Sequence, residues 1–381
     1  MSLALERLRA RLVARAAAPR SSRRGAESAR GVTMPGPEAA LRQLSLRLRA
    51  EIRPTRALTL RDFIAMLPDE RPLFVVSDGI GVDSTAMLVG LWRLGVRPDV
   101  ILHADTGDEH PATVVYRDER RAWLRSIGFP DLTIVRRSPS RSKKTGLAFS
   151  TLGEKCIANE TLPSLAFGGK SCSVEWKIKP QERWLKGHTG AQRTWASGNK
   201  VVKAIGYDAG SVDSRRAHDL KSDARYDYVY PLREWSWDRA RAVAEIRAAG
   251  LRVPRKSACV FCPASKPWEI AEIVRDWPEI ADRIIAIEDR ARPNLREVEG
   301  LWRKTIKGMR GAVPRPGSMA AFIRGLRADP EVLRRYLAMA PAEDASAATD
   351  VGSMPRFKSA PASTRRRLAL APEVVAWGGL A

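Results

Sequence analysis

A short run of small and acidic residues, placed between an apolar stretch and a helical one, is the first feature of this chain that implies chemistry. Residues 77–85 read SDGIGVDST and follow the apolar, β-branched residues 73–76. A helix predicted to begin near Asp83 directs its unpaired first-turn N–H groups, and the positive end of its dipole, at this loop. An anion such as pyrophosphate is the expected ligand of this loop. Gly79 and Gly81 allow the anion to approach the backbone closely.

The loop does not follow the two commonest nucleotide fingerprints. A Walker loop needs Lys after its last Gly, and a dinucleotide fold needs three glycines at fixed spacing; neither is present. Taken alone, residues 77–85 are also compatible with a tight turn in an ordinary α/β domain.

The cysteines carry a second chemical argument. There are 4 Cys in 381 residues and no apolar secretory segment at the start, so we do not expect a disulfide framework. Cys259 and Cys262 form a CxxC pair, and Cys156 and Cys172 are the other two. Four cysteines that converge on one site hold zinc or an iron-sulfur cluster, and thiolate geometry does not separate these. Zinc sites usually show two close pairs, whereas only one pair is close here.

A predicted βαβ unit positions the loop. Residues 73–76 have the length of a buried strand, Gly95 ends the helix, and residues 99–103 form the next strand after a right-handed crossover. Asp105 and Thr106 then lie at the carboxyl end of that strand, where open α/β sheets bind ligands. The fold predicted is α/β, a Rossmann-like, doubly wound and mostly parallel sheet, with further strands near Leu132, Val201 and Tyr228 and helices near Thr113 and Asp238.

Five segments, in the same order, resemble the phosphoadenosine phosphosulfate (PAPS) reductase-like family of the adenine nucleotide alpha hydrolase, or PP-loop, superfamily. The loop resembles the family's SGGxDS motif, and ADTGDEHPATVVY resembles DTG-x-E-x-P-x-T-x-x-Y. The other three are GKSCSVEWKIKPQ, YPLREWSWD and KSACVFCP, which resemble KSCSxKWKIxPQ, PLxEWxxxD and SGCxFCP. The match covers roughly residues 73–267. Phage-borne PAPS reductase-like proteins and the ATPase component of DNA phosphorothioation are the relatives it suggests.

The resemblance implies ATP, or PAPS, and Mg²⁺ as cofactors. Ile80 stands where the family usually has glycine, and its β-branched side chain is expected to narrow the pyrophosphate seat. For Thr106, a cap on the strand is an equal alternative. For each basic candidate, a solvated surface charge is the alternative, and the position of the residue in a matched segment makes the two readings equal. The implied nucleotide-binding residues are Ser77, Gly79, Gly81, Val82, Asp83, Ser84, Thr85, Asp105, Thr106, Lys179, Arg215 and Arg216, and the candidate catalytic residues are Asp83, Ser84, Asp105 and Lys177.

For the cysteines, the resemblance favours a 4Fe-4S cluster, with zinc as the alternative. The tandem CC of adenylylsulfate reductases is Ser171-Cys172 in this chain, so Cys156 must supply the fourth ligand beside Cys172, Cys259 and Cys262. A small buried apolar role is the other reading of Cys156.

Three functions follow. The first is an enzyme that cleaves ATP at the α-phosphate, with pyrophosphate release, during sulfur transfer to or modification of nucleic acid. The second is a thiol-dependent PAPS or adenylylsulfate reductase, whose nucleophile is a C-terminal Cys; no Cys follows Cys262, which favours the first. The third is a non-catalytic, cluster-bearing subunit that binds nucleic acid, for which Ile80 is the main argument.

The charge suits a polyanionic partner. Lys plus Arg number 66 against 43 Asp plus Glu, a formal net charge of +23, so nucleic acid is the expected partner and a sulfur-donor protein a further one. Dense basic stretches include residues 136–144. A GC-rich genome also inflates arginine, and a generic basic surface is the alternative.

The chain is predicted to contain one nucleotide-binding domain with additions at both ends. Residues 1–56 are predicted to be a basic flexible arm; an organellar transit peptide, or translation from Met34, would explain the same composition. The expected divisions are 57–267 for the nucleotide-binding domain with its four-Cys site, 268–340 for a helical appendage broken around 311–316, and 341–381 for a weakly structured tail. We find no transmembrane run and expect a cytoplasmic protein.

Overall fold

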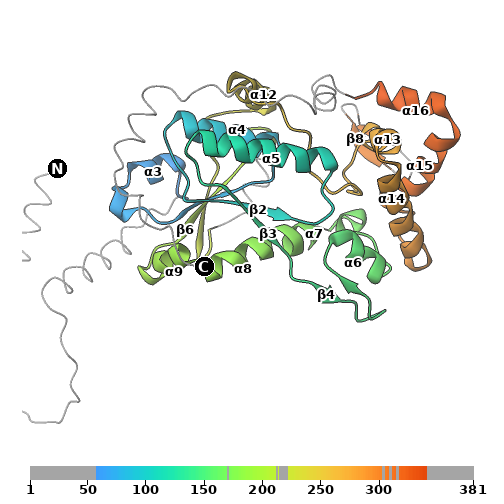
Figure 1. Ribbon diagram of the computed structural model, residues 1–381, viewed down its shortest axis with the longest axis horizontal. Coiled ribbons are helices and arrows are strands. Elements are labelled where there is room, and N and C mark those ends of the chain that lie inside the picture. The colour runs from blue at the N-terminus through green and yellow to red at the C-terminus, as the bar shows by residue number, and fades with distance from the viewer. Residues whose placement is uncertain are drawn as a thin grey trace, which may run out of the picture. The chain divides into compact units, whose positions relative to one another are not determined.

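The computed structural model describes residues 57–169, 171–211, 213, 222–302, 305–308, 311–314 and 317–340, without side chains for 305–308 and 311–314 (Figure 1). The predicted basic arm and C-terminal tail lie outside these residues, as do Arg215 and Arg216. No helix of the described part is long and apolar enough to cross a membrane.

Five parallel strands form the central sheet, in the order β3-β2-β1-β6-β7. β1 has β2 on one side and β6 on the other, so the winding of the chain reverses at β1. Open α/β sheets bind their ligands outside the carboxyl ends of the strands at such a point. The predicted Rossmann-like, doubly wound sheet is confirmed. Its strands are β1 (Phe74–Ser77), β2 (Val100–Asp105), β3 (Leu132–Arg136), β6 (Val201–Ile205) and β7 (Tyr226–Val229), each at a predicted position.

Helices cover both faces of this sheet (Figure 1). One face carries α3 (Leu60–Ala65), α4 (Val82–Arg93), α5 (Pro111–Ser126) and α12 (Arg239–Ala248), whose apolar side chains join the main core. The other face packs against α8 (Lys179–Gly187) and α9 (Thr189–Ala196) through a smaller core that includes Leu185 and Ala191. Strands buried on both faces explain the near-continuous apolar runs of β1 and β2.

Short elements link β3 to α8 and carry two of the cysteines. They are β4 (Ser140–Arg141), β5 (Ala148–Phe149), α6 (Leu152–Ala158), a 3₁₀ turn (Ser164–Phe167), α7 (Ser171–Ser173) and a π-helical turn (Val174–Ile178). β4 and β5 pair antiparallel as a small hairpin. The π-helical turn runs directly into α8, and such turns are frequent at functional sites.

Residues after 266 form the C-terminal helices expected from the sequence, together with a hairpin that was not expected. The helices α13 (Pro267–Asp276), α14 (Pro278–Ala291), α15 (Met319–Ala328) and α16 (Pro330–Leu337) share a second core with α6 and β5. The strands β8 (Thr305–Gly308) and β9 (Gly311–Pro314) pair antiparallel where the sequence predicted only a break in helical periodicity.

A buried carboxylate holds this C-terminal unit together. Glu288 on α14 is 1% exposed and accepts hydrogen bonds from the backbone N–H groups of Leu301 (2.5 Å), Met319 (2.8 Å) and Ala320 (2.8 Å), and from the Ser318 hydroxyl. It therefore satisfies the first N–H groups of α15, which no helical carbonyl reaches. The remaining short elements of the described residues are 3₁₀ turns at Pro68–Glu70 and Arg292–Asn294 and a helical turn, α11, at Pro231–Glu234.

Candidate active site

The loop between β1 and α4 presents an open helix N-terminus at the carboxyl edge of the sheet. Gly81 is the N-cap of α4 in an extended conformation, and no side chain caps the helix. The first-turn N–H groups and the positive end of the helix dipole are therefore available to an anion. The end of β6 approaches closely: a Cβ on Gly206 would lie 2.9 Å from the Ser84 nitrogen, so only glycine fits there.

A buried ion pair supports the loop from beneath. Asp78 and Arg120 are both fully buried, and the guanidinium lies 3.0 Å from Asp78 Oδ1 and 2.5 Å from the Thr85 hydroxyl oxygen. The same carboxylate oxygen accepts from the Ile80 N–H at 2.7 Å. The Thr85 hydroxyl in turn donates to the Gly81 carbonyl at 2.7 Å. Arg120 thus ties both ends of the loop to α5, and Thr85 acts as a support of the loop rather than as a wall of the cavity.

Ile80 does not narrow the anion seat. Its side chain is 1% exposed and joins the main core, and it does not line the cavity described below. The backbone turns into the left-handed region, with φ of 57°, to direct the side chain inward. A β-branched residue in that region is strained by roughly 1–2 kcal/mol, and burial of the side chain offsets this cost. Ile80, where the family has glycine, therefore adds a side chain to the main core and not to the cavity. The prediction that it narrows the pyrophosphate-binding site is wrong.

A cavity of about 500 Å³ opens between this loop and α8. Seven of the predicted residues line it: Ser77, Gly79, Gly81, Val82, Asp83, Ser84 and Lys177. The other walls come from the ends of β2, β6 and β7, from α8 and from the segment before the CxxC pair, and include Asp78, His103, Gln181, Lys203, Ile205, Gly206, Tyr207, Tyr228, Arg239, Lys256 and Ser257. Its volume and mixed polar and apolar lining suit a nucleotide.

Asp83 is the carboxylate in the first turn of α4. Burial raises its pKa, and the neighbouring Asp208 and Asp213 add to this effect, while Arg239, at 3.2 Å, opposes it. Ser84 is 6% exposed, and its hydroxyl donates to the Gly81 carbonyl at 3.3 Å.

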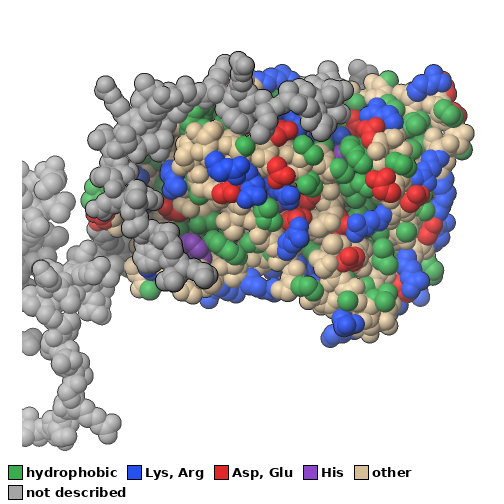
Figure 2. Space-filling model, viewed as in Figure 1, with side chains coloured by type: hydrophobic (Ala, Val, Ile, Leu, Met, Phe, Trp, Pro, Cys, Tyr) green, Lys and Arg blue, Asp and Glu red, His purple; other side chains and the backbone are tan. Residues whose placement is uncertain are grey.

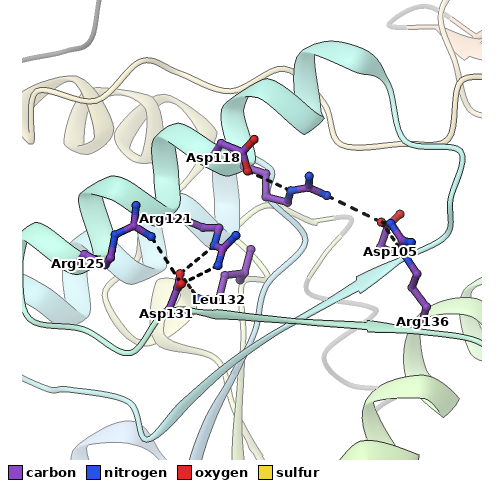
Figure 3. Close-up of polar contacts among 8 residues, drawn as sticks. Asp105, Asp118, Arg121, Arg125, Asp131, Leu132 and Arg136 are labelled. Atoms are coloured by element: carbon purple, nitrogen blue, oxygen red, sulfur yellow. Dashed lines mark hydrogen bonds and ion pairs between the residues drawn. The ribbon is translucent and has the colours of Figure 1, made fainter.

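Asp105 points away from the cavity, into an ion pair at the next strand end. Its carboxylate accepts from the Gly107 N–H at 2.8 Å and from Arg136 at 2.5 and 3.0 Å, and Arg117 lies 3.8 Å away (Figure 3). Burial alone would raise the pKa of Asp105, but the Gly107 hydrogen bond and the Arg136 guanidinium outweigh it and lower that pKa. In the described structure this carboxylate orders the turn after β2 and does not line the nucleotide cavity.

Thr106 lies at the cysteines. Its hydroxyl oxygen is 3.2 Å from Cys259 Sγ and 3.3 Å from Glu109 Oε1. Backbone bonds join the same two segments, since Glu109 forms an isolated antiparallel bridge with Cys259 and the Val260 N–H donates to the Asp108 carbonyl at 2.9 Å. The DTG segment and the CxxC segment, 150 residues apart, therefore form one site.

Lys177 belongs to both the cavity and the cysteine site. Burial lowers its pKa, but the charges of Glu109, Cys259, Cys262 and Cys172 outweigh that effect and raise it. The same lysine lines the nucleotide cavity. Its ammonium group therefore adds positive charge to the wall of the cavity, five residues after Cys172 in the chain.

Cys156 is the exception among the four cysteines. It is 2% exposed in the second core, and burial raises the pKa of its thiol to about 12. Cys172, Cys259 and Cys262 are half-buried, and burial raises the pKa values of Cys259 and Cys262 as well. In the described part of the chain, no group of three or more His, Cys, Asp or Glu side chains is arranged to hold a metal ion. The four-cysteine cage predicted from the sequence is not assembled in this structure.

Lys203 is a charged residue of the cavity wall that is not among the residues predicted from the sequence. It is 4% exposed in the middle of β6, lines the cavity, and its ammonium group lies 5.0 Å from the centre of the Tyr226 ring. Burial lowers its pKa, against the opposing charges of Glu182 and Asp223. A signal was available, because Lys203 interrupts the apolar run VVKAI.

Lys179 is exposed on α8 and does not line the cavity, and Arg215 and Arg216 lie outside the described residues.

No protein-family model and no curated protein matches the chain. Among solved structures, it is similar to the phosphoadenylyl-sulfate (PAPS) reductase from Candida auris in a phosphate complex, with 14% identity over 59% of this chain and 92% of that one and a TM-score of 0.32. It is also similar to the U34-tRNA thiolase NcsA from Methanococcus maripaludis, determined with its 4Fe-4S cluster, with 14% identity over 84% of this chain and 86% of that one and a TM-score of 0.33.

Proposed function

We propose that this protein binds ATP, as its Mg²⁺ complex, in the cavity beside α4 and cleaves it at the α-phosphate during sulfur transfer to nucleic acid. The observation that carries the proposal is that the segments bearing the cysteines border the cavity: Lys177, five residues after Cys172, and Ser257, two residues before Cys259, both line it. A site of this kind brings an activated substrate and a sulfur atom into one place.

Some residues of the cavity bind the nucleotide, and others stabilise the charge that develops during the reaction. The first-turn N–H groups of α4 hold the pyrophosphate portion. Lys177, from the π-helical turn, and Lys203, from β6, supply positive charge at the cavity wall to the charge that develops on the transferred phosphate. Asp83 adds a carboxylate at the same edge, suited to a Mg²⁺ water shell.

In the proposed reaction, a substrate oxygen attacks the α-phosphorus, the bond to the β-bridging oxygen breaks, and pyrophosphate leaves with the electron pair. A hydrosulfide ion delivered by a donor then attacks the carbon that carries the activated oxygen. That C–O bond breaks and AMP leaves, so oxygen is replaced by sulfur without a change in overall oxidation state.

The cysteines are the candidate metal ligands beside the cavity. Cys172, Cys259 and Cys262 are the ligands that a 4Fe-4S cluster, or zinc, would use first, because soft thiolates suit both. Binding of either metal requires their surroundings to rearrange, because the described residues do not gather three such side chains into a metal site.

The position of Ile80 removes the main argument for a non-catalytic subunit, because its side chain leaves the anion seat open. A PAPS reductase remains the runner-up, and thiol-dependent reduction of PAPS is the assay that identifies it.

The test is release of AMP and pyrophosphate from α-labelled ATP with Mg²⁺, in the presence of bulk tRNA or single-stranded DNA. We expect Asp83→Ala to lower the rate at least 10-fold, and Asp118→Ala, an exposed change on α5, to leave it within twofold of the wild type. Equal rates in wild type and Asp83→Ala would show that the loop does not hold the nucleotide.

A further inference from the structure

The exposed face of α8 carries a line of positive charge. Lys179, Arg183 and Lys186 are exposed and spaced at i, i+4 and i+7, which places them on one side of the helix. None of the three forms an ion pair with a carboxylate among the described residues; Arg183 instead donates to the Ser138 hydroxyl at 2.7 Å. In Figure 2, Lys and Arg side chains lie along the lower edge of the molecule, the edge where Figure 1 draws α8. Positive charges in a row suit a polyanion.

One end of this line lies at the nucleotide cavity. Lys177, Ile178 and Gln181, from the π-helical turn and the first turn of α8, line that cavity, and Lys179 lies between them. Lys186 lies seven positions after Lys179, a rise of about 10 Å along the helix. A stacked single strand, which rises about 3.4 Å along its axis per phosphate, would place about three phosphates over that length.

The other end of the line opens into a second cavity, of about 590 Å³. Lys186 forms part of its wall, with Gln192, Trp195, Gly198, Asn199, Ala224 and Arg225. These residues come from the end of α9 and from the segment before β7, so the second cavity is separate from the nucleotide site.

Trp195 and Arg225 are prearranged in this second cavity. The Trp195 ring packs edge-on against Tyr226, with centroids 6.1 Å apart, and its Nε1–H donates to the Arg225 carbonyl at 3.0 Å. The Arg225 guanidinium lies 5.4 Å from the centre of the Trp195 ring. An aromatic ring and a guanidinium plane are the surfaces on which unpaired bases stack, and Asn and Gln side chains provide hydrogen bonds to base edges.

We propose that α8 and the second cavity form the docking track for a single-stranded nucleic-acid substrate. The backbone phosphates lie over Lys179, Arg183 and Lys186, and an unpaired base occupies the second cavity against Trp195. A nucleotide at the other end of the strand is then delivered to the nucleotide cavity beside Lys177. This track rests on the proposed function for its purpose, and it extends that function by naming the substrate class and the surface that binds it.

The test compares two double variants that remove the same charge from opposite faces of the sheet. Arg183→Gln with Lys186→Gln removes charge from the track, and Arg61→Gln with Arg247→Gln removes it from exposed positions on α3 and α12. Binding of fluorescein-labelled single-stranded 12-mers of RNA and of DNA is measured by anisotropy between 50 and 200 mM salt. The two probes separate an RNA substrate from a DNA substrate.

We expect the track variant to weaken binding at least 10-fold and to lower the slope of log K against log salt by about 1–2, since each lost phosphate contact is worth about 0.7 on a single strand. The matched variant should change binding less than twofold. Trp195→Leu should weaken binding with an unchanged salt slope, because stacking does not depend on counterion release. Equal losses in the two double variants, or tighter binding of a duplex 12-mer than of both single strands, would overturn the track.

ATP binding, measured on the same proteins by calorimetry, separates this inference from the proposed function. The track variant should bind ATP as the wild type does. If neither the wild type nor the variants bind ATP, the proposed function fails. If the track variant still loses single-strand binding in that case, the docking surface stands.

Discussion

The guanidinium of Arg120, on α5, lies 3.0 Å from the carboxylate of Asp78, in the loop after β1, and neither side chain is exposed to solvent. The arginine also reaches the Thr85 hydroxyl in the first turn of α4. The loop whose backbone N–H groups face an anion is therefore held in place by the ion pair between Arg120 and Asp78. Because the positive charge of Arg120 is paired with Asp78, it does not bind a ligand.

Replacement of Arg120 by Met should destabilise the protein by about 3–5 kcal/mol, because the buried Asp78 carboxylate is left without its partner. The double variant Arg120→Met with Asp78→Asn should recover part of that loss. Chemical denaturation measures both. Arg121→Met is the matched control: Figure 3 shows its ion pair with Asp131. Both side chains are exposed, and an exposed ion pair contributes about 0–1 kcal/mol. Equal losses from the two Met variants would contradict a supporting role for the buried pair.

Lys203→Met should separate stability from binding. Its buried ammonium group has no carboxylate partner within ion-pair distance in the described residues, so Met, of similar length, should raise the free energy of unfolding by about 1 kcal/mol. ATP binding should fall at least 10-fold, because a cation is lost from the cavity wall. Calorimetric titration and denaturation give the two values, and lower stability with unchanged affinity would show that Lys203 is structural.

The pH dependence of unfolding gives an independent check on Lys203. Its pKa is lowered in the folded state from 10.5, so the unfolded chain binds more protons between the two pKa values. The free energy of unfolding should therefore gain a rising contribution as pH increases through that window toward 10.5. The contribution should be absent in Lys203→Met.

Asp105 should behave as a structural carboxylate. Because its pKa is lowered in the folded state, its contribution to stability is fully present above the unfolded value of 3.8 and is lost as the pH falls through the folded value. Asp105→Asn should therefore lower the free energy of unfolding at neutral pH and flatten its decline below about pH 5, with ATP affinity within twofold of the wild type. A large loss of ATP affinity with unchanged stability would place Asp105 at the nucleotide instead.

The cysteines can be tested by anaerobic purification, the visible absorption spectrum, and analysis of iron, sulfide and zinc. We expect metal in the wild type, its loss in Cys259→Ser, and its retention in Cys156→Ala, because Cys156 is buried in the second core. Stoichiometric iron and sulfide identify a cluster, and zinc alone identifies a structural site. Loss of metal in both variants would support the four-cysteine set predicted from the sequence, and metal-free wild type would remove the cofactor from the proposal.

Local patterns were enough to predict the five strands of the central sheet and the helices α4, α5 and α12, whereas α6, α8 and α9 were not predicted. The apolar run before Ser77, the small residues after it and the helix beginning near Asp83 each depend on neighbours a few residues away, and the sheet confirms them. The C-terminal helices were predicted on the same basis. The β8–β9 hairpin was missed, because strand pairing links residues that a helical period does not relate.

The candidate site, like the fold, could be predicted only in part. Local residue patterns predicted a loop with a helix N-terminus after the first strand of the sheet, and the DTG and CxxC segments can be found without a structure. The contacts that their side chains make depend on how distant segments pack. The register of β2 and β3 puts Asp105 opposite Arg136, and backbone bonds to the CxxC segment bring Thr106 to Cys259. Which face of β6 meets the cavity decides that Lys203 lines it, and the packing of α6 on α14 buries Cys156. Such contacts depend on residues far apart in the chain, because partners across strands and layers are fixed by register and packing, which no local spacing encodes.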